Sequence, residues 1–497
     1  MQRIADCGCV CRLWRQSALV SGKFFEDSKE TELFRLRKIR VVARTATLVF
    51  FKKVSKQGLG QRPKVFLFVE RSSMTARSIA CEVLTRCEKS GQYSNLALDA
   101  ALRRGGLNES DRALATVLTY GVLERKLTLD HCISRLSARP LNQISPEVLN
   151  HLRIGLYQLA YLDRIPDHAA VNEAVSLAGK KAGGFVNAVL REFIRREKEI
   201  PLPDPSADRL KYLSVAYSVG TELCERLLNT FGEEKCESLL GAFGEHPPLT
   251  VRVNTLKTTR EKLLNTLRDA GYQAEGTKRS RSGIRIYGNA AVTAMPGFAD
   301  GEFFVQDEAS QLCVEALDAG PGMRVLDTCA CPGSKSFGAA INMKNEGELI
   351  SCDLHASKLS LVTSGAKRLG IGILRTLERD ARSENPEWNG TFDRVLCDVP
   401  CSGFGVIAKK PELRYKDPAV SDGLPDIQLA ILRASAEYLR SGGKLIYSTC
   451  TIFPRENGEN IRRFLCERPE FSLALEMPLF PDTDGTDGFY IAVLEKK

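Results

Sequence analysis

The last 200 residues of the chain alternate between short apolar runs and helical patterns, and this alternation limits the possible folds more than any other feature. Runs rich in Val, Leu and Ile that end in Asp, Pro or Gly are typical of buried parallel strands. Strands that alternate with helices predict a doubly wound, parallel α/β sheet. The predicted strands cover 323–327, 348–353, a short segment ending near Asp380, 394–397, 445–447 and 488–494.

Two cysteine motifs follow the fourth and fifth of these predicted strands. They read Asp398-Val399-Pro400-Cys401-Ser402 and Ser448-Thr449-Cys450. Ligands of open α/β sheets bind beyond the carboxyl ends of the strands, so we expect Asp398, Cys401 and Cys450 to converge on one crevice. Cysteine is often simply a small buried hydrophobe. We favour that interpretation for Cys313, Cys352 and Cys397, but not for the two cysteines at strand ends.

The first predicted strand leads into a turn that is suited to a cofactor. A turn between a strand and a helix directs backbone N–H groups toward a ligand. Because this turn is not GxGxxG, a nucleoside cofactor without a pyrophosphate fits it better than a dinucleotide. S-adenosylmethionine is such a cofactor. Its methionine end would contact the turn, which consists of Cys329, Ala330, Cys331, Pro332, Gly333, Ser334 and Lys335.

Acidic residues after the next strands complete the predicted cofactor site. Asp353 lies 20 residues after Gly333, a separation at which an acidic side chain can bind ribose hydroxyls. Asp380 would contact the adenine edge. Asp398 is the third acid that we expect to bind the cofactor. Taken singly, each acid is better explained as a helix cap or a surface residue. Their succession at strand ends favours the cofactor interpretation.

Three further segments precede this catalytic part, which we place at 301–497. Helical periodicity over 74–205 predicts an all-helical domain, and 206–300 predicts a small α+β subdomain. Residues 1–73 hold 16 Lys and Arg against 6 Asp and Glu, whereas the remainder is nearly neutral. This basic stretch is a nucleic-acid arm, a targeting segment, or translated sequence upstream of a functional start at Met74. We favour the third interpretation.

Composition argues against several classes of protein. No run of about 18 apolar residues occurs, so no membrane span is expected. The 16 cysteines lack a disulfide spacing and a CxxC pair, and the five histidines do not cluster. We therefore expect reduced thiols, a cytoplasmic location and no metal. The run Cys7-Gly8-Cys9-Val10-Cys11 could hold a soft metal, but we favour a disordered terminus.

A basic loop follows the first cysteine motif. It contains Lys409, Lys410, Arg414 and Lys416 and is suited to contact with an RNA backbone.

Several more stretches have counterparts in one known family. They are Arg252-Val253-Asn254-Thr255-Leu256, Val305-Gln306-Asp307-Glu308-Ala309-Ser310, Asn457 and Gly485-Thr486-Asp487-Gly488-Phe489-Tyr490. Together with the turn at 329–335 and the two cysteine motifs, they make residues 74–497 resemble the bacterial 16S ribosomal RNA (cytosine-5) methyltransferase B family. The cysteine motifs, about 50 residues apart, are the most specific part of this resemblance.

The resemblance implies a Rossmann-like S-adenosylmethionine methyltransferase domain behind a NusB-like helical domain and a small α+β subdomain. It implies methylation of carbon 5 of a cytosine in small-subunit rRNA, with Cys450 as the nucleophile. A thiolate that adds to carbon 6 makes carbon 5 nucleophilic. Asp398 would stabilise charge near nitrogen 3, and Cys401 would assist release. Lys335 is a candidate to favour the Cys450 thiolate, or to contact cofactor or RNA.

The expected partner is small-subunit rRNA before full ribosome assembly, bound by a monomer without metal or membrane. Two alternatives stay open, a tRNA cytosine-5 methyltransferase and a non-catalytic RNA-binding assembly factor. The sequence also departs from the family pattern. Cys331 and Ser334 replace an alanine and a glycine, so the backbone at Ser334 is less free. Val399 and Phe404 are larger than usual, and we expect them to narrow the base pocket.

Overall fold

The computed structural model of the chain describes residues 74–288 and 291–497. The predictions for residues 1–73, including the Cys7–Cys11 metal site, lie outside the described residues. Thr75–Lys497 form one compact unit.

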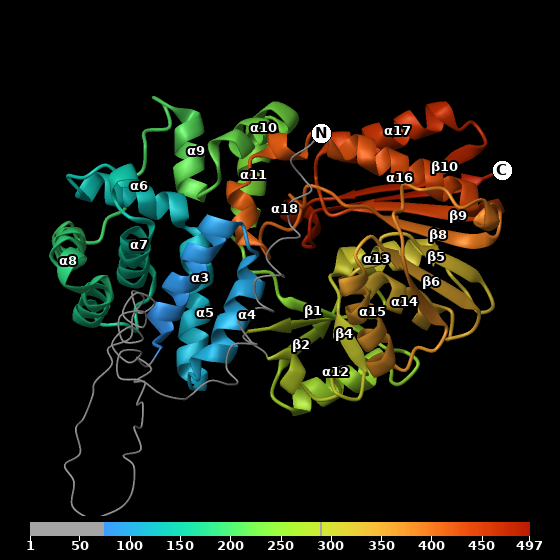
Figure 1. The fold of residues 1–497 in the computed structure, drawn as a ribbon, viewed down its shortest axis with the longest axis horizontal. Helices are drawn as coiled ribbons and strands as arrows, with labels where there is room; N and C mark the ends of the chain where they lie inside the picture. Colours follow the sequence, from blue (N-terminus) through green and yellow to red (C-terminus); the bar gives the residue numbers. More distant parts are fainter. Residues whose placement is uncertain (1–73, 289–290) are drawn as a thin grey trace, which may run out of the picture. The chain divides into compact units, whose positions relative to one another are not determined.

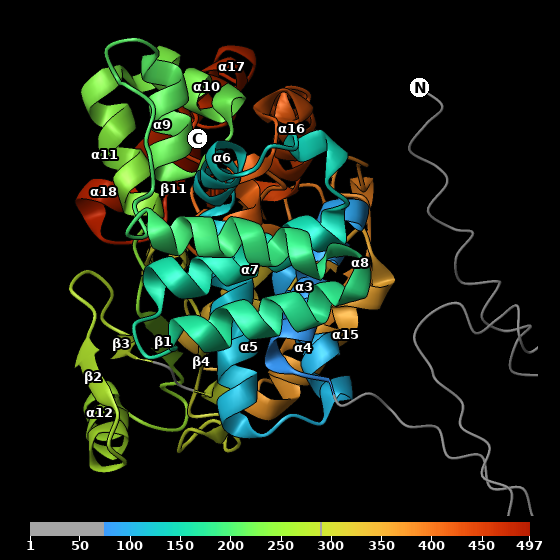
Figure 2. The same cartoon turned by 90° about the vertical axis from the view of Figure 1, so that its left-hand side faces the viewer.

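The N-terminal part of this unit is helical, because apolar residues recur there at helical spacing and capping residues begin the helices. Thr75 and Ser78 form a reciprocal capping box at the first helix. A buried cluster that includes Leu118, Leu156 and Phe193 joins the helices, and α7 and α8 pack along each other (Figure 2). The helices are α3 (Ala76–Ser90), α4 (Ser94–Gly105), α5 (Glu109–Glu124), α6 (Lys126–Leu136), α7 (Pro146–Tyr161) and α8 (Asp167–Arg195), the last interrupted at Gly179.

Three further helices pack beside the catalytic part of the chain. They are α9 (Arg209–Tyr217), α10 (Thr221–Phe231) and α11 (Glu233–Phe243), of which α11 was not predicted. Their apolar faces share a cluster with Phe404, Ile407 and Phe453. The segment that begins at residue 206 therefore contributes its helices to the surroundings of the catalytic domain.

A small antiparallel sheet follows, with strand order β2-β3-β1-β4. Its elements are β1 (Leu249–Val253), α12 (Arg260–Asp269), β2 (Gln273–Gly276), β3 (Gly283–Tyr287) and β4 (Phe303–Val305). Val251 pairs with both Ile284 and Val305. The edge strand β4 thus lies beyond residue 300 and still belongs to this sheet.

The catalytic part contains a seven-stranded mixed sheet with the order β10-β11-β9-β8-β5-β6-β7. The predicted strands appear as β5 (Arg324–Asp327), β6 (Glu348–Asp353), β7 (Leu374–Glu378), β8 (Phe392–Asp398), β9 (Leu439–Thr449) and β11 (Phe489–Lys496). These strands are parallel up to β9, but β11 and the unpredicted β10 (Phe471–Leu479) extend the sheet antiparallel. The prediction of a wholly parallel sheet is wrong at this edge, because a short connection between β10 and β11 returns the chain antiparallel.

Helices cover both faces of this sheet (Figure 1). On one face lie α13 (Glu308–Leu317), α14 (Ser334–Asn342) and α15 (Ala356–Leu369), which pack on Val325, Leu349 and Leu396. On the other lie α16 (Leu424–Tyr438) and α17 (Gly458–Glu467), which pack on Leu326 and Leu445. The fold is therefore a Rossmann-like three-layer domain.

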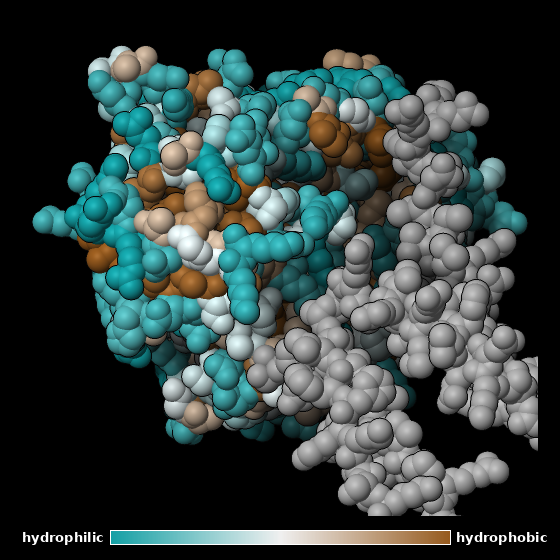
Figure 3. Space-filling view, turned by 60° about the vertical axis from the view of Figure 1, so that its left-hand side comes forward, coloured by the Kyte–Doolittle hydropathy of each residue, from teal (hydrophilic) through white to brown (hydrophobic). Residues whose placement is uncertain are grey.

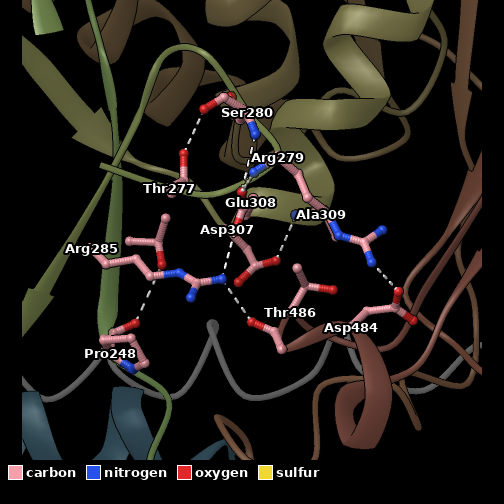
Figure 4. A network of polar contacts seen from close by, with 12 residues as sticks. Pro248, Thr277, Arg279, Ser280, Arg285, Asp307, Glu308, Ala309, Asp484 and Thr486 are labelled. Atoms are coloured by element: carbon pink, nitrogen blue, oxygen red, sulfur yellow. Dashed lines mark hydrogen bonds and ion pairs between the residues drawn. The ribbon is translucent and has the colours of Figure 1, made fainter. Parts of the chain in front are cut away.

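A polar network fixes the small sheet to the catalytic domain (Figure 4). Glu308, buried at the start of α13, accepts hydrogen bonds from the backbone N–H groups of Arg279 and Ser280, at 2.6 and 3.0 Å. Arg285 donates to the other oxygen of Glu308 at 2.6 Å and to the Gly485 carbonyl at 3.0 Å. Arg279 also pairs with Asp484. The hairpin loop and the C-terminal turn are thereby held against the same helix.

The face drawn in Figure 3 is mostly hydrophilic, with hydrophobic side chains gathered in separate patches. Among the described helices, none has the length and apolar content that a membrane crossing requires. Within residues 74–288 and 291–497, no group of three His, Cys, Asp or Glu side chains is arranged to hold a metal ion.

Candidate active site

The candidate site lies where the strand order reverses. From β5 the chain proceeds to β6 and β7 on one side, and β8 and β9 lie on the other. Open α/β sheets bind ligands at such a point, beyond the carboxyl ends of the strands. A cavity of about 960 Å³ opens there. Its lining includes Cys329, Cys331, Asp353, Asp380, Asp398, Cys401 and Cys450, together with Tyr93 and Lys126 of the helical domain.

The two strand-end cysteines lie in contact, which confirms the predicted convergence. The Sγ atoms of Cys401 and Cys450 are 3.2 Å apart, and the backbone N–H of Cys450 donates to the Cys401 sulfur at 3.3 Å. A hydrogen bond from the Cys401 thiol lowers the pKa of Cys450, and the charges of Lys335 and Lys410 act in the same direction. The same hydrogen bond, together with burial, raises the pKa of Cys401. The arrangement therefore favours a thiolate at Cys450 and a thiol at Cys401.

Asp398 is held from two sides at the end of β8. Lys335 Nζ lies 2.7 Å from Asp398 Oδ2, and the hydroxyl of Ser448 donates to Oδ1 at 2.8 Å. Lys335 is almost fully buried. Burial opposes its charge, but the neighbouring Asp398 carboxylate prevails and raises the pKa of Lys335. The last residue of the predicted cofactor turn is thus a fixed cation whose charge acts on Cys450.

The predicted cofactor turn contributes only part of its side chains to the cavity. Cys329 and Cys331 line it, whereas Ala330, Gly333 and Lys335 are buried and Pro332 is exposed outside the lining. Gly333 has a φ of 109°, a left-handed conformation that favours glycine. Ser334 is the first residue of α14. The expectation that serine restricts the turn at position 334 is wrong, because the positive φ falls one residue earlier.

The acids after β6 and β7 both line the cavity but differ in their partners. Asp353 accepts the His355 N–H at 3.0 Å through Oδ1. The two oxygens of Asp380 are engaged by the Arg382 guanidinium, with Nη2 2.6 Å from Oδ2, and these hydrogen bonds lower the pKa of Asp380. Asp353 thus offers a freer carboxylate than Asp380.

The two residues that we expected to narrow the base pocket lie in different places. Val399 lines the cavity and is mostly buried. Phe404 instead packs edge to face on Phe453, at a centroid distance of 5.6 Å, within the cluster beneath α9–α11. The prediction that Phe404 narrows the base pocket is wrong, because the loop turns this ring away from the cavity. Cys313, Cys352 and Cys397 are buried as predicted.

The basic loop that follows Cys401 is also different from the expectation. Lys409 binds Asp307 and Asp487, the latter at 2.9 Å. Arg414 is buried and donates to the carbonyls of Tyr217 and Phe243. Burial removes Arg414 from any RNA, so the RNA contact predicted for this residue is wrong. Lys409 stays exposed beside its two carboxylate partners, so the prediction for it stays open. Lys410 and Lys416 do line the cavity.

Two buried acids beside the site, Asp327 and Glu456, were missed by sequence reasoning. Asp327 ends β5 and accepts the Ser336 hydroxyl at 2.6 Å. Burial raises the pKa of Asp327 to about 7. Asp327 ends its strand as Asp353 does, and this position in the sequence could have identified it as a candidate site residue. Glu456 had no local signal, because its partners lie far away in the sequence.

Glu456 is the acceptor of a buried network behind Cys401. Its Oε2 accepts the backbone N–H of Ser402 at 2.8 Å and the Gln428 amide at 3.0 Å, and its Oε1 accepts the Ser402 hydroxyl at 2.5 Å. Gln428 also donates to the Pro400 carbonyl at 3.0 Å. The backbone on either side of Cys401 is therefore fixed from α16 and from the segment after β9.

Comparisons with known proteins agree with this geometry. Residues 314–495 match the model for 16S rRNA methyltransferase RsmB/F, residues 74–195 match the NusB family, and residues 223–293 match the ferredoxin-like domain of RsmF/B-like methyltransferases. A probable ribosomal RNA small subunit methyltransferase B of Bacillus subtilis is 37% identical, over 85% of this chain and 99% of the relative. The ribosomal RNA small subunit methyltransferase B of Serratia proteamaculans is 32% identical, over 86% of this chain and 100% of the relative.

Solved structures show the same fold. The crystal structure of PH0851 has a TM-score of 0.72 and 27% identity, covering 85% of this chain and 99% of its own. A methyltransferase homologue protein from Pyrococcus horikoshii has a TM-score of 0.51 and 25% identity, covering 59% of this chain and 100% of its own. The helical domain, the small sheet and the catalytic domain thus all have counterparts in known proteins.

Proposed function

The chain belongs to the ribosomal RNA small subunit methyltransferase B family, and we propose that it methylates carbon 5 of a cytosine in small-subunit rRNA through a covalent bond between Cys450 and the base. The observation that carries the proposal is the contact between Cys401 and Cys450, whose sulfurs are 3.2 Å apart beside the Lys335–Asp398 pair. One cysteine would suffice for addition. A second cysteine at this distance is suited to a separate release step.

S-adenosylmethionine is the methyl donor that we propose, and it would supply an electrophilic methyl group on a sulfonium. The residues present fit such a ligand. Asp353, at the cavity wall, has carboxylate capacity left for ribose hydroxyls, since the His355 N–H engages Oδ1. Asp380 lies in the same wall for the adenine edge, and the turn from Cys329 to Lys335 would meet the methionine end.

The proposed roles of the catalytic residues follow from their positions. The Cys450 thiolate forms a bond to carbon 6 of cytosine, and the electron pair of the broken C5=C6 double bond makes carbon 5 nucleophilic. Asp398 hydrogen-bonds the ring near nitrogen 3, and Lys335, 2.7 Å from Asp398, offsets negative charge that develops there. After methyl transfer, carbon 5 loses its proton with assistance from Cys401. The C6–S bond then breaks, which restores the double bond and frees Cys450.

RNA is the substrate class that we propose, and the helical domain 74–205 is the proposed RNA-binding module. This assignment rests on the match of residues 74–195 to the NusB family and on the names of the relatives. We propose that a monomer acts on the rRNA before the small subunit is fully assembled.

Covalent trapping tests this proposal. Wild type, Cys401→Ala and Cys450→Ala are incubated with unmodified small-subunit rRNA and S-adenosylmethionine, and denaturing gels then display protein–RNA adducts. We expect an adduct to accumulate with Cys401→Ala and to be absent with Cys450→Ala. Bisulfite sequencing of the wild-type product maps the modified cytosine.

The alternatives are outcomes of the same experiment. An adduct that forms only on tRNA would identify a tRNA cytosine-5 methyltransferase. RNA binding without any adduct or methyl transfer, on either RNA, would identify a non-catalytic binding factor. An adduct that survives Cys450→Ala would contradict the assignment of the nucleophile.

A further inference from the structure

The cavity at the strand ends has a second wall, which comes from the helical domain. Residues from the end of α3 to the start of α4 line it, including Cys87, Gly91, Gln92 and Tyr93. The cysteine pair lines the same cavity. A nucleotide beside a cytosine at Cys450 would therefore meet a surface that the catalytic domain does not supply.

Tyr93 is the aromatic side chain of this second wall that projects into solvent. It is 50% exposed. The other tyrosine of the cavity lining, Tyr415, is more buried, and its hydroxyl bonds the Leu123 carbonyl. About half of Tyr93 is thus open to an occupant of the cavity.

The position of Tyr93 is fixed relative to the cysteine pair. The next residue, Ser94, donates from its backbone N–H and its hydroxyl to the Glu412 carboxylate, at 3.3 and 2.8 Å. Glu412 belongs to the loop that follows Cys401. A carboxylate at the first turn of α4 also interacts favourably with the helix dipole. The backbone next to Tyr93 is thus anchored to the loop that follows Cys401.

Two cations of the same loop lie beside the ring and the cysteine pair. Lys410 Nζ lies 5.6 Å from the centroid of the Tyr93 ring, and Lys410 forms no ion pair within the described part of the chain. Lys416 lines the cavity and donates to the Ser402 carbonyl at 3.3 Å. Aromatic rings beside cations form the platforms on which proteins bind single-stranded RNA.

We propose that Tyr93 stacks on the base of a nucleotide next to the target cytosine, and that Lys410 binds the adjoining phosphate. This inference rests on the proposed function, because it takes RNA as the occupant of the cavity. Stacking holds the strand while the target base reaches Cys450, as base chemistry requires an unstacked base. Because every base has a π-face, the contact tolerates different flanking bases.

The test compares Tyr93→Phe, Tyr93→Leu and Tyr93→Ala in the full chain. Leu96→Ala is the matched control, since Leu96 lies in the first turn of α4, which Tyr93 precedes, is 58% exposed and does not line the cavity. Filter binding and steady-state methylation use an rRNA fragment that contains the mapped cytosine. We expect Tyr93→Ala to raise the Kd and KM for RNA about 10- to 100-fold, with Tyr93→Phe close to wild type and Tyr93→Leu close to the alanine variant.

Two readouts separate stacking from a structural role. The melting temperature and the KM for S-adenosylmethionine should stay unchanged in Tyr93→Ala. With 5-iodouridine placed on either side of the target, irradiation should crosslink the RNA to Tyr93. An RNA affinity of Tyr93→Ala equal to wild type, or an equal loss in the phenylalanine variant, would overturn the proposal.

The experiment gives a different result if the proposed function is wrong than if the stacking role of Tyr93 is wrong. If wild type binds full-length small-subunit rRNA without methylating any cytosine, the enzymatic proposal fails, while filter binding on that rRNA still measures the contribution of Tyr93. A raised KM for S-adenosylmethionine with unchanged RNA affinity would assign Tyr93 to the cofactor and refute the stacking role.

Discussion

Replacing Glu456 by alanine should both destabilise the protein and slow the release step of the proposed reaction. Glu456 is 4% exposed and accepts three hydrogen bonds, two of them from Ser402 and one from Gln428. The Ser402 hydroxyl keeps a second acceptor, Thr451 Oγ1 at 2.8 Å, and Gln428 keeps the Pro400 carbonyl. The backbone N–H of Ser402 loses its side-chain acceptor and remains buried.

The expected loss of stability follows from the hydrogen bonds that Glu456→Ala removes. A buried donor without a partner costs about 1–3 kcal/mol, and the weakened Gln428 contact adds about 1 kcal/mol. We therefore expect Glu456→Ala to lower the free energy of unfolding by about 2–4 kcal/mol, measured by urea denaturation. Because Ser402 follows Cys401, the loop should also lose the position that keeps the two sulfurs together. The covalent adduct should then persist longer than in wild type.

Glu456→Gln is the matched control. Its amide oxygen can still accept from the Ser402 N–H and from Gln428, while its NH₂ group can donate to the Ser402 hydroxyl, which in turn donates to Thr451. This variant should lie within about 1.5 kcal/mol of wild type. A Glu456→Ala variant within about 0.5 kcal/mol of wild type, with normal adduct turnover, would refute the reasoning.

Three further predictions concern charge and packing around the site. Because burial raises the pKa of Asp327 to about 7, the native state binds this proton more tightly than the unfolded chain, so its contribution to stability is present at about pH 4 and is lost as the pH rises through 7. Asp327→Asn should flatten the unfolding free energy between these pH values, as measured by urea denaturation across that range, and an unchanged profile would contradict the shift. Lys335→Met removes a cation that lowers the pKa of Cys450, so iodoacetamide alkylation of Cys450 at neutral pH, followed by peptide mass spectrometry, should slow about 3- to 10-fold. Tyr415→Phe removes the hydroxyl that bonds the Leu123 carbonyl and accepts the Lys126 N–H at 3.2 Å, and it should cost about 1–3 kcal/mol in thermal unfolding, whereas a variant as stable as wild type would show that water replaces the hydroxyl.

Local sequence patterns carried enough information for much of the catalytic domain. The apolar run before Asp398 became β8, and the run before Cys450 became the end of β9. Because parallel strands end at one edge of the sheet, two local motifs about 50 residues apart were enough to predict that their cysteines meet. The helical domain was predicted for a similar reason, since its apolar periodicity is repeated within each helix.

The misses share a different physical cause. The edge strand β10 exposes most of its residues, so it lacks the buried run that marks the inner strands. We expected Ser334 to restrict the turn because the family pattern has a glycine there. The residue with a positive φ, 109°, is instead Gly333, which precedes the first residue of α14. Phe404 and Arg414 were assigned to the pocket and to RNA by proximity in sequence, whereas packing against α9–α11 buries both.

The sequence by itself thus determined the strand and helix pattern, the parallel core of the sheet and the meeting of Cys401 with Cys450, because each depends on local periodicity and on one geometric rule. Only the tertiary structure decided that Lys335 pairs with Asp398, that Glu456 supports the Cys401 loop and that Tyr93 faces the cavity. These contacts join residues from 54 to more than 300 positions apart, as Ser402–Glu456 and Ser94–Glu412 do. No local pattern encodes such pairs, since the packing of whole elements brings their side chains together.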